Sequence, residues 1–157
     1  MKVPFNNLKI IHDQIKDEVL AKTDNTISKN SFILSDEVKD FEQHYAKYSK
    51  SKYSVSCSNG TVALELVLKT LKKDSKKSEV LVPVNSFIAT SFAVSNANLK
   101  PIFYDCDEYY LGDTTSLESK ITSRTLAIIG VNLYGQIINL ENFSSISKKY
   151  DLPLIID

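Results

Sequence analysis

Glycine is scarce in this sequence, which has only 4 glycines among its 157 residues. A protein of this length with an average glycine content of about 7% would have roughly 11. A biased genome or relaxed selection on turns would each explain the shortage, and the sequence does not separate the two.

Net charge and long apolar runs are also missing, and their absence excludes two classes of partner. The 19 Lys and Arg residues balance 19 Asp and Glu residues, so the chain lacks the broad basic field that nonspecific nucleic-acid binding needs. No apolar run approaches the roughly 18 residues of a membrane span. The N-terminal stretch MKVPFNNLKIIHDQ becomes polar too early for a signal peptide. We therefore expect a cytoplasmic protein with no nucleic-acid or membrane partner.

Cysteine and histidine are scarce, with two residues of each. Cys57 and Cys106 lie far apart and fit no metal-ligand spacing, so we expect two buried, reduced thiols that pack as small hydrophobic side chains. His12 and His44 lie among polar residues of predicted helices, and surface positions explain them without chemistry. No metal site is predicted.

Helix and strand patterns are clear along most of the chain. Residues 8–22 have a loosely amphipathic helical pattern, residues 23–34 read as a polar loop, and Ser35 is the predicted N-cap of a helix to Tyr48. Strands are then predicted at 53–57, 79–82, 100–105, 126–131 and 154–156, and helices at 61–72, 86–96, 115–121 and 140–150. This alternation is typical of βαβ units in an α/β fold with a mostly parallel sheet, and the nearly continuous apolar strands indicate that both faces are covered.

The organisation of the chain follows from these patterns. We expect an N-terminal helix and loop segment, residues 1–34, followed by one incomplete domain, residues 35–157. The sequence stops at Asp157, directly after the apolar run LPLII. Because a sheet strand is an unusual natural terminus when no element follows to cover it, we expect a piece of a longer protein.

Ligands of open α/β sheets bind at the carboxyl ends of the strands, and one such junction reads Ser58-Asn59-Gly60-Thr61. Gly60 allows a close backbone approach, and the helix that follows offers free N–H groups and a positive dipole end. Together they suit a phosphate, to which Thr61 adds a hydroxyl. The alternative, at about even weight, is that Asn59 or Thr61 serves only as an N-cap.

Two other strand ends offer complementary chemistry. Phe87, at a strand-to-helix junction, would stack on a planar ring, although packing in the core would also explain an aromatic there. Asp157 ends an apolar strand, where a carboxylate is costly unless it is paired or faces a ligand such as a cationic ring nitrogen; a helix cap or an exposed terminus is the alternative. A phosphate holder, a ring stacker and a carboxylate meet the three needs of pyridoxal phosphate (PLP).

The sequence resembles the N-terminal part of the DegT/DnrJ/EryC1/StrS family of PLP-dependent sugar aminotransferases over essentially its whole length. The similar segments follow the family's order and spacing, and they are VPF, NSFILSDEVKDFEQHYAKY, SNGTVALELVLKTL, EVLVPVNSFIATSFAV, KPIFYDCD and VNLYGQIINLENFSSISKKYDLPLIID. The resemblance implies the large domain of a fold type I PLP-transferase, an αβα sandwich with a mostly parallel sheet, truncated at its C-terminus.

The resemblance also implies roles for particular residues. Asn59, Gly60 and Thr61 would bind the cofactor phosphate, Phe87 would stack on the pyridine ring, and Asp157 would pair with the pyridine nitrogen. Family members transfer an amino group from glutamate to a nucleotide-linked keto-sugar, often for polysaccharide biosynthesis, and they are typically homodimers. Which sugar and which carbon is aminated do not follow from these residues.

The sequence departs from the family pattern in two respects. The Schiff-base lysine of the family lies beyond Asp157, so no residue of this chain takes that catalytic role and we expect the 157-residue chain alone to be inactive. In addition, Asn30, Ser35, Lys50 and Asn98 stand where the family usually has glycine. Asn and Ser tolerate some glycine backbones, whereas Lys at a positive φ would be strained.

Two alternatives remain open at this point. The chain could be a catalytically dead remnant or a pseudoenzyme that acts by binding, which the missing lysine and the replaced glycines favour. Alternatively, the strand end IFYDCDEYY resembles the nucleophile strand of Mg²⁺-dependent haloacid-dehalogenase phosphohydrolases, with Asp105 as nucleophile and Asp107 as acid/base. The expected Gly-Thr turn does not follow that motif, which makes the second alternative the weaker one.

Overall fold

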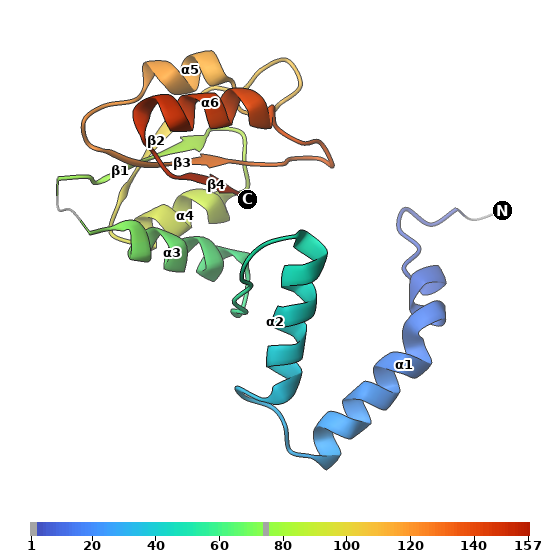
Figure 1. The fold of residues 1–157 in the computed structure, drawn as a ribbon. Coiled ribbons are helices and arrows are strands. Elements are labelled where there is room, and N and C mark those ends of the chain that lie inside the picture. Colours follow the sequence, from blue (N-terminus) through green and yellow to red (C-terminus); the bar gives the residue numbers. More distant parts are fainter. Residues whose placement is uncertain (1–2, 74–75) are drawn as a thin grey trace. The chain divides into compact units, whose positions relative to one another are not determined.

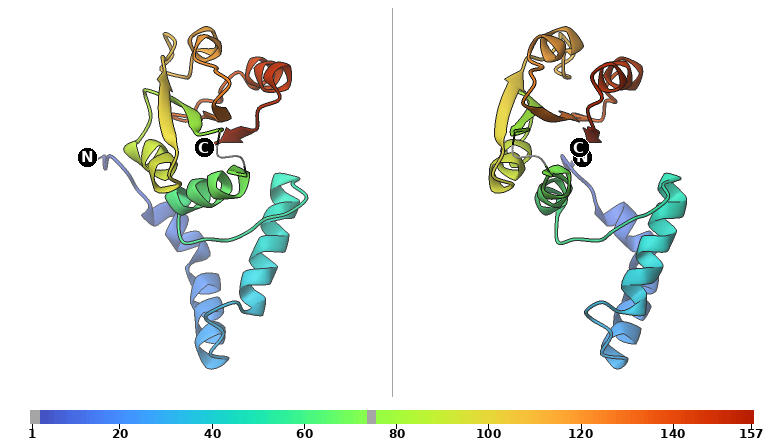
Figure 2. Two further views of the ribbon diagram at one scale, coloured as in Figure 1. Left: turned by 90° about the vertical axis from the view of Figure 1, so that its left-hand side faces the viewer. Right: turned by 60° about the vertical axis from the view of Figure 1, so that its left-hand side comes forward.

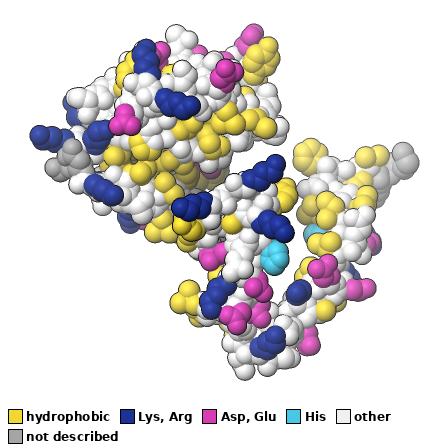
Figure 3. All heavy atoms as spheres, viewed as in Figure 1, with side chains coloured by type: hydrophobic (Ala, Val, Ile, Leu, Met, Phe, Trp, Pro, Cys, Tyr) yellow, Lys and Arg dark blue, Asp and Glu magenta, His cyan; other side chains and the backbone are white. Residues whose placement is uncertain are grey.

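A computed structural model describes residues 3–73 and 76–157 and divides the chain into two compact units, one ending at Ser56 and the other running from Cys57 to Asp157 (Figure 1). The first unit contains the helices α1, Lys9–Ser28, and α2, Asp36–Ser49, and neither helix has a buried residue. Apolar side chains lie among charged ones on its surface (Figure 3). None of the described helices is both long and apolar enough to cross a bilayer.

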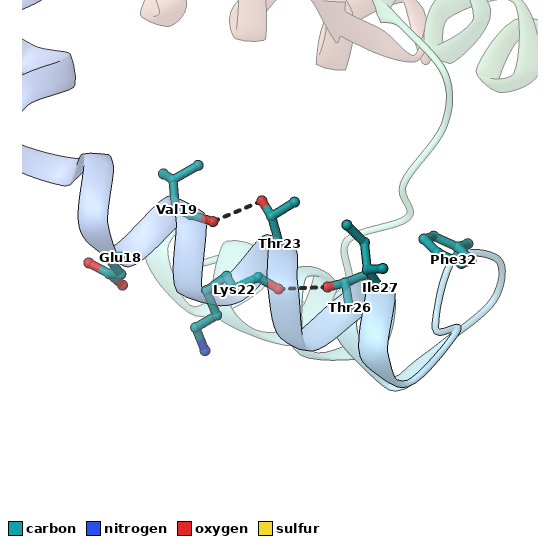
Figure 4. Close-up of a pocket in the computed structure, with 7 residues that line it drawn as sticks. All are labelled: Glu18, Val19, Lys22, Thr23, Thr26, Ile27 and Phe32. Atoms are coloured by element: carbon teal, nitrogen blue, oxygen red, sulfur yellow. Dashed lines mark hydrogen bonds between the residues drawn. The ribbon is translucent and has the colours of Figure 1, made fainter.

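Helix α1 is longer than the predicted helix 8–22 and continues to Ser28, so the predicted loop was wrong for residues 23–28. The Thr23 and Thr26 hydroxyls donate to the carbonyls of Val19 and Lys22, at 2.8 and 2.9 Å (Figure 4). A threonine inside a helix can point its hydroxyl to solvent or donate it to the carbonyl four residues earlier. Both threonines do the latter, so they remain compatible with the helix.

Ser35 is the N-cap residue of α2, as predicted, but its side chain makes no capping hydrogen bond. Three aromatic rings follow one another along this helix, with ring centroids 5.8 Å apart for Phe41 and Tyr45 and 6.2 Å apart for Tyr45 and Tyr48.

The predicted strand at 53–57 is wrong, because these residues pair with no other strand of the described chain. The Glu42 carboxylate accepts hydrogen bonds from both the backbone N–H and the hydroxyl of Ser56, each at 2.7 Å. The Ser56 backbone N–H, which would donate to a neighbouring strand in a sheet, therefore donates to the Glu42 side chain instead. The Cys57 thiol that follows is exposed and that of Cys106 is half-buried, so the expectation of two buried thiols was also wrong.

The second unit is built on a parallel sheet with strand order β2-β1-β3-β4. The strands are β1, Glu79–Pro83, β2, Lys100–Tyr104, β3, Thr125–Gly130, and β4, Leu154–Ile156. The helices are α3, Gly60–Leu71, α4, Ile88–Asn96, α5, Thr114–Ser119, and α6, Leu140–Tyr150. Each agrees with its predicted range to within about two residues, so the alternation of strands and helices is confirmed.

The sheet of this unit is sandwiched between two helical layers, with α3 and α4 on one face and α5 and α6 on the other (Figures 1 and 2). Alternate strand residues enter two separate cores. Val80 and Val82 pack with Leu68 of α3 and Val94 of α4, whereas Leu81 packs in the cluster that α5 and α6 cover. The predicted αβα architecture is therefore confirmed.

The positions where glycine was expected mostly adopt the left-handed conformation. Asn30, Lys50 and Asn98 have φ values of 51°, 54° and 55°, whereas Ser35 has a φ of −84° and needs no glycine. The structure thus bears out the inference of strain at Lys50, which follows α2 as its C-cap.

Lys50→Gly is expected to stabilise the protein by about 0.5–1 kcal/mol. The substitution removes a left-handed penalty of about 1–2 kcal/mol, and the greater freedom of glycine in the unfolded chain offsets part of the gain. Urea unfolding followed by circular dichroism measures the change. Lys52→Gly, in the exposed segment that follows α2, is the control and should bring no gain; equal effects of the two variants would contradict the explanation.

Candidate functional site

Several strand ends of the second unit meet in one pocket of about 340 Å³. Four of the five predicted site residues line it, namely Gly60, Thr61, Phe87 and Asp157. The other lining residues are Leu64, Ser86, Ala89, Thr90, Val131, Asn132 and Leu133. The pocket therefore lies at the carboxyl edge of the sheet, where α/β proteins bind their ligands.

The first turn of α3 forms one side of this pocket. Asn59 lies outside the lining and acts as an N-cap, since its Oδ1 accepts the Val62 N–H at 3.0 Å. The first helical hydrogen bond runs from the Ala63 N–H to the Asn59 carbonyl, at 3.0 Å. The N–H groups of Gly60 and Thr61 precede it and have no acceptor within the helix.

Gly60 adds open space next to these N–H groups. A Cβ placed on Gly60 would meet no atom within 4 Å, so the glycine is not needed for packing within the second unit. Free amides, a helix dipole and room for a ligand are the properties of an anion site.

Phe87 lies at the N-cap position of α4 and is 76% exposed. That exposure excludes the alternative of ordinary core packing in this unit. The ring instead lines the pocket together with the first turn of α3. An aromatic face in that position is available to stack on a planar ligand.

Asp157 is held in place by the neighbouring strand end and by α4. Its N–H donates to the Gly130 carbonyl at 2.9 Å, and its own carbonyl accepts the Asn132 N–H at 3.0 Å. Its Oδ2 accepts a hydrogen bond of 2.7 Å from the Thr90 hydroxyl. Thr90 is 2% exposed and its Oγ1 lies 2.8 Å from the Ser86 Oγ.

Sequence reasoning did not single out Thr90 as a site residue. The available signal was its position four residues after Ser86, which lies just before α4 while Thr90 lies in its first turn. The sequence does not show that this turn meets Asp157, because 67 residues separate Thr90 from it.

The carboxylates of the Asp-x-Asp motif lie outside the pocket lining and serve as turn acceptors. Asp105 Oδ1 accepts the Cys106 N–H at 2.8 Å. Asp107 Oδ1 accepts the N–H groups of Tyr109 and Leu111, at 2.9 and 3.0 Å. Within residues 3–73 and 76–157, no three His, Cys, Asp or Glu side chains form a group suited to a metal ion. The local structure thus gives the phosphohydrolase alternative no support.

A larger hollow of about 480 Å³ lies along α1 in the first unit. Its lining residues, shown in Figure 4, are Glu18, Val19, Lys22, Thr23, Thr26, Ile27 and Phe32. It contains none of the predicted site residues, and its two threonine hydroxyls donate to backbone carbonyls, so its size alone does not indicate a reaction.

The arrangement at the carboxyl edge agrees with a match to known proteins. The model of the DegT/DnrJ/EryC1/StrS aminotransferase family matches residues 13–157. The chain belongs to this family. Family members use PLP, and the match confirms the resemblance on which the site residues were predicted.

Relatives of this DegT-family chain include two sugar transaminases. It is 36% identical to dTDP-3-amino-3,6-dideoxy-alpha-D-galactopyranose transaminase of Aneurinibacillus thermoaerophilus, covering 99% of this chain and 43% of that protein. It is also 36% identical to UDP-2-acetamido-2-deoxy-3-oxo-D-glucuronate aminotransferase of Pseudomonas aeruginosa, with the same coverage. The chain thus spans less than half the length of these relatives.

The fold agrees with that of a crystallised protein. The crystal structure of DesV from S. venezuelae superposes with a TM-score of 0.92 at 28% identity, covering 99% of this chain and 42% of that one. The α/β architecture of the DegT-family chain therefore matches part of the fold type I aminotransferase large domain.

Proposed function

We propose that this chain is the N-terminal part of a PLP-dependent aminotransferase that moves an amino group from glutamate to a nucleotide-linked keto-sugar. The observation that carries the proposal is the single pocket that combines the first turn of α3, the exposed ring of Phe87 and the carboxylate of Asp157. The names of the two sugar transaminases support the substrate class.

Each part of the pocket suits one part of the cofactor. The N–H groups of Gly60 and Thr61 would bind the phosphate at the positive end of α3. Phe87 would stack on the pyridine ring, and the Asp157 carboxylate would accept a hydrogen bond from the protonated ring nitrogen. Asn59 would contribute indirectly by capping α3. When bound, PLP supplies the electron sink for amino transfer.

Cofactor binding and amino transfer are separable in this proposal. The residues that would hold the phosphate and the ring lie within the 157 residues, whereas the family resemblance implies a Schiff-base lysine at a position after Asp157. The 157-residue polypeptide would therefore bind the cofactor without covalent attachment and would not transaminate, because the central acid/base is absent.

We further propose a cytoplasmic homodimer, in which residues 35–157 belong to the PLP-binding large domain and residues 1–34 precede it.

The strained Lys50 favours one second candidate, a pseudoenzyme or remnant that acts by binding. A left-handed lysine at a usual glycine position is what relaxed selection on turns would leave. The gene sequence after the Asp157 codon distinguishes the candidates, since an open frame with a Ser and Lys segment supports the enzyme and a stop codon supports the remnant.

The proposal is tested by titrating the purified chain with pyridoxamine 5′-phosphate, which lacks an aldehyde and so cannot attach to surface lysines. The chain has no tryptophan, so the fluorescence of the ligand can be followed without interference from indole. Saturable binding that inorganic phosphate competes away is the expected result. Absence of saturable binding would overturn the assignment of the site.

The expected inactivity of the same polypeptide is checked separately. With PLP, glutamate and a nucleotide-linked keto-sugar, it should form no amino sugar detectable by mass spectrometry. Steady turnover would show that a group within the 157 residues performs the acid/base chemistry, and it would overturn that part of the proposal.

A further inference from the structure

The hydroxyl groups of Ser86, which precedes α4, and Thr90, in its first turn, form a short chain of hydrogen bonds with a defined direction. Asp157 Oδ2 accepts from Thr90 Oγ1 at 2.7 Å, so the single hydroxyl proton of Thr90 is committed to the carboxylate. The contact of 2.8 Å between Thr90 and Ser86 must then be donated by Ser86. Ser86 thus donates to Thr90, and Thr90 donates to the Asp157 carboxylate, which accepts.

This direction leaves one carboxylate oxygen for a ligand. None of the described residues donates a side-chain hydrogen bond to Asp157 Oδ1, whereas Oδ2 is occupied by Thr90. A carboxylate with one oxygen fixed by a buried hydroxyl has lost its freedom to rotate, and pre-organisation of this kind strengthens the contact made by the other oxygen.

The same turn of α4 also carries Phe87. The Thr90 N–H donates to the Phe87 carbonyl at 3.0 Å, so the residue that binds the carboxylate is tied to the residue that presents the aromatic ring. A ligand ring that stacks on Phe87 therefore meets a carboxylate whose orientation is set by the same helical turn.

We infer that Thr90 is a positioning residue for the ring-nitrogen contact, in which its buried hydroxyl holds Oδ2 of Asp157 and leaves Oδ1 to accept from the pyridine N–H. This inference deepens the proposed function and rests on it. Thr90 touches the carboxylate and needs no contact with the ligand ring.

The test uses Thr90→Val, which keeps the shape of the side chain and removes its hydroxyl. The variant is titrated with pyridoxamine 5′-phosphate labelled with ¹⁵N in the ring, and the nitrogen chemical shift is followed against pH. We expect about tenfold weaker binding, the size of a lost hydrogen bond to a charged group, and loss of the ring proton at a lower pH than in the wild type. Thr90→Ser restores the hydroxyl and should restore both quantities.

Two further variants separate positioning from folding. Thr125 is 1% exposed and its hydroxyl oxygen accepts the Thr122 N–H at 2.9 Å, so Thr125→Val removes an equally buried hydroxyl outside the pocket. It should leave the affinity and the pH of ring deprotonation unchanged, even where it lowers the melting temperature. If Thr90→Val fails to fold, Ser86→Ala should produce a smaller change of the same sign.

The outcomes distinguish the inference from the function on which it rests. No binding by the wild type would overturn the proposed function, and this inference with it. Binding by the wild type together with an unchanged affinity and ring-nitrogen titration in Thr90→Val would overturn the role of Thr90 alone.

Discussion

Replacement of Phe143 by alanine is expected to lower the free energy of unfolding by about 3–5 kcal/mol. Phe143 is 1% exposed and packs its ring at 6.4 Å between centroids from that of Tyr104, whose pKa is raised by burial. A Cβ placed on Gly112 or Gly130 would lie 3.2 and 3.4 Å from the Phe143 ring. These two glycines have no side chain that could move into the vacated space, so much of the cavity should persist.

Urea unfolding monitored by circular dichroism measures this loss. Phe92→Ala is the matched control, because Phe92 lies on α4 and is 55% exposed, and surface substitutions usually change stability by less than about 0.5 kcal/mol. A loss for Phe143→Ala no larger than that for Phe92→Ala would show that the core beneath α6 is not packed as described.

Gly60→Asp is expected to weaken the binding of pyridoxamine 5′-phosphate strongly while leaving stability unchanged or slightly higher. The new side chain enters open space, and an acidic residue in the first turn of a helix contributes about 0.3–1 kcal/mol of stabilisation. The same carboxylate would occupy the proposed phosphate position. Like charges about 4 Å apart repel by about 4 kcal/mol near a protein surface, so affinity should fall by at least about 100-fold.

Fluorescence titration and thermal unfolding of the same sample give the two quantities. Leu140→Asp is the control, because Leu140 is the first residue of α6, is 46% exposed and belongs to the opposite helical layer. It should leave the affinity unchanged. If Gly60→Asp binds as tightly as the wild type, the phosphate does not bind at the start of α3.

The elements of the second unit could be predicted because each strand and helix has a strong local pattern. The apolar strands Glu79–Pro83 and Thr125–Gly130 are buried along their whole length. A short, nearly continuous apolar run is typical of a strand that is covered on both faces. The segment 53–57 has an equally suitable composition but no partner strand among the described residues, and the Glu42 carboxylate accepts the hydrogen bond of the Ser56 backbone N–H. Strand pairing depends on distant residues, so composition alone misled the prediction there.

Most residues of the candidate pocket that were predicted from the sequence lie at the ends of strands or the starts of helices. Gly60, Thr61, Phe87 and Asp157 each end a strand or begin a helix, and the topology of a parallel sheet gathers such positions at one edge. Thr90 has no such signal, because a threonine inside a helix is ordinary until its partner is known. Its contact with Asp157 joins segments 67 residues apart, which is information that only the fold supplies.

The strand order also determines how the second unit can assemble during synthesis. Strand β1 lies inside the sheet, between β2 and β3, so it needs two partners that the ribosome makes at different times. Lys100–Tyr104 emerges first, and Thr125–Gly130 follows about a second or more later at typical rates of 5–20 residues per second. During that interval the apolar strand Glu79–Pro83 has one unpaired edge, and unpaired edges promote association between chains. Even after β2 has paired, the nascent chain therefore remains open to association at one edge of β1 until β3 has paired.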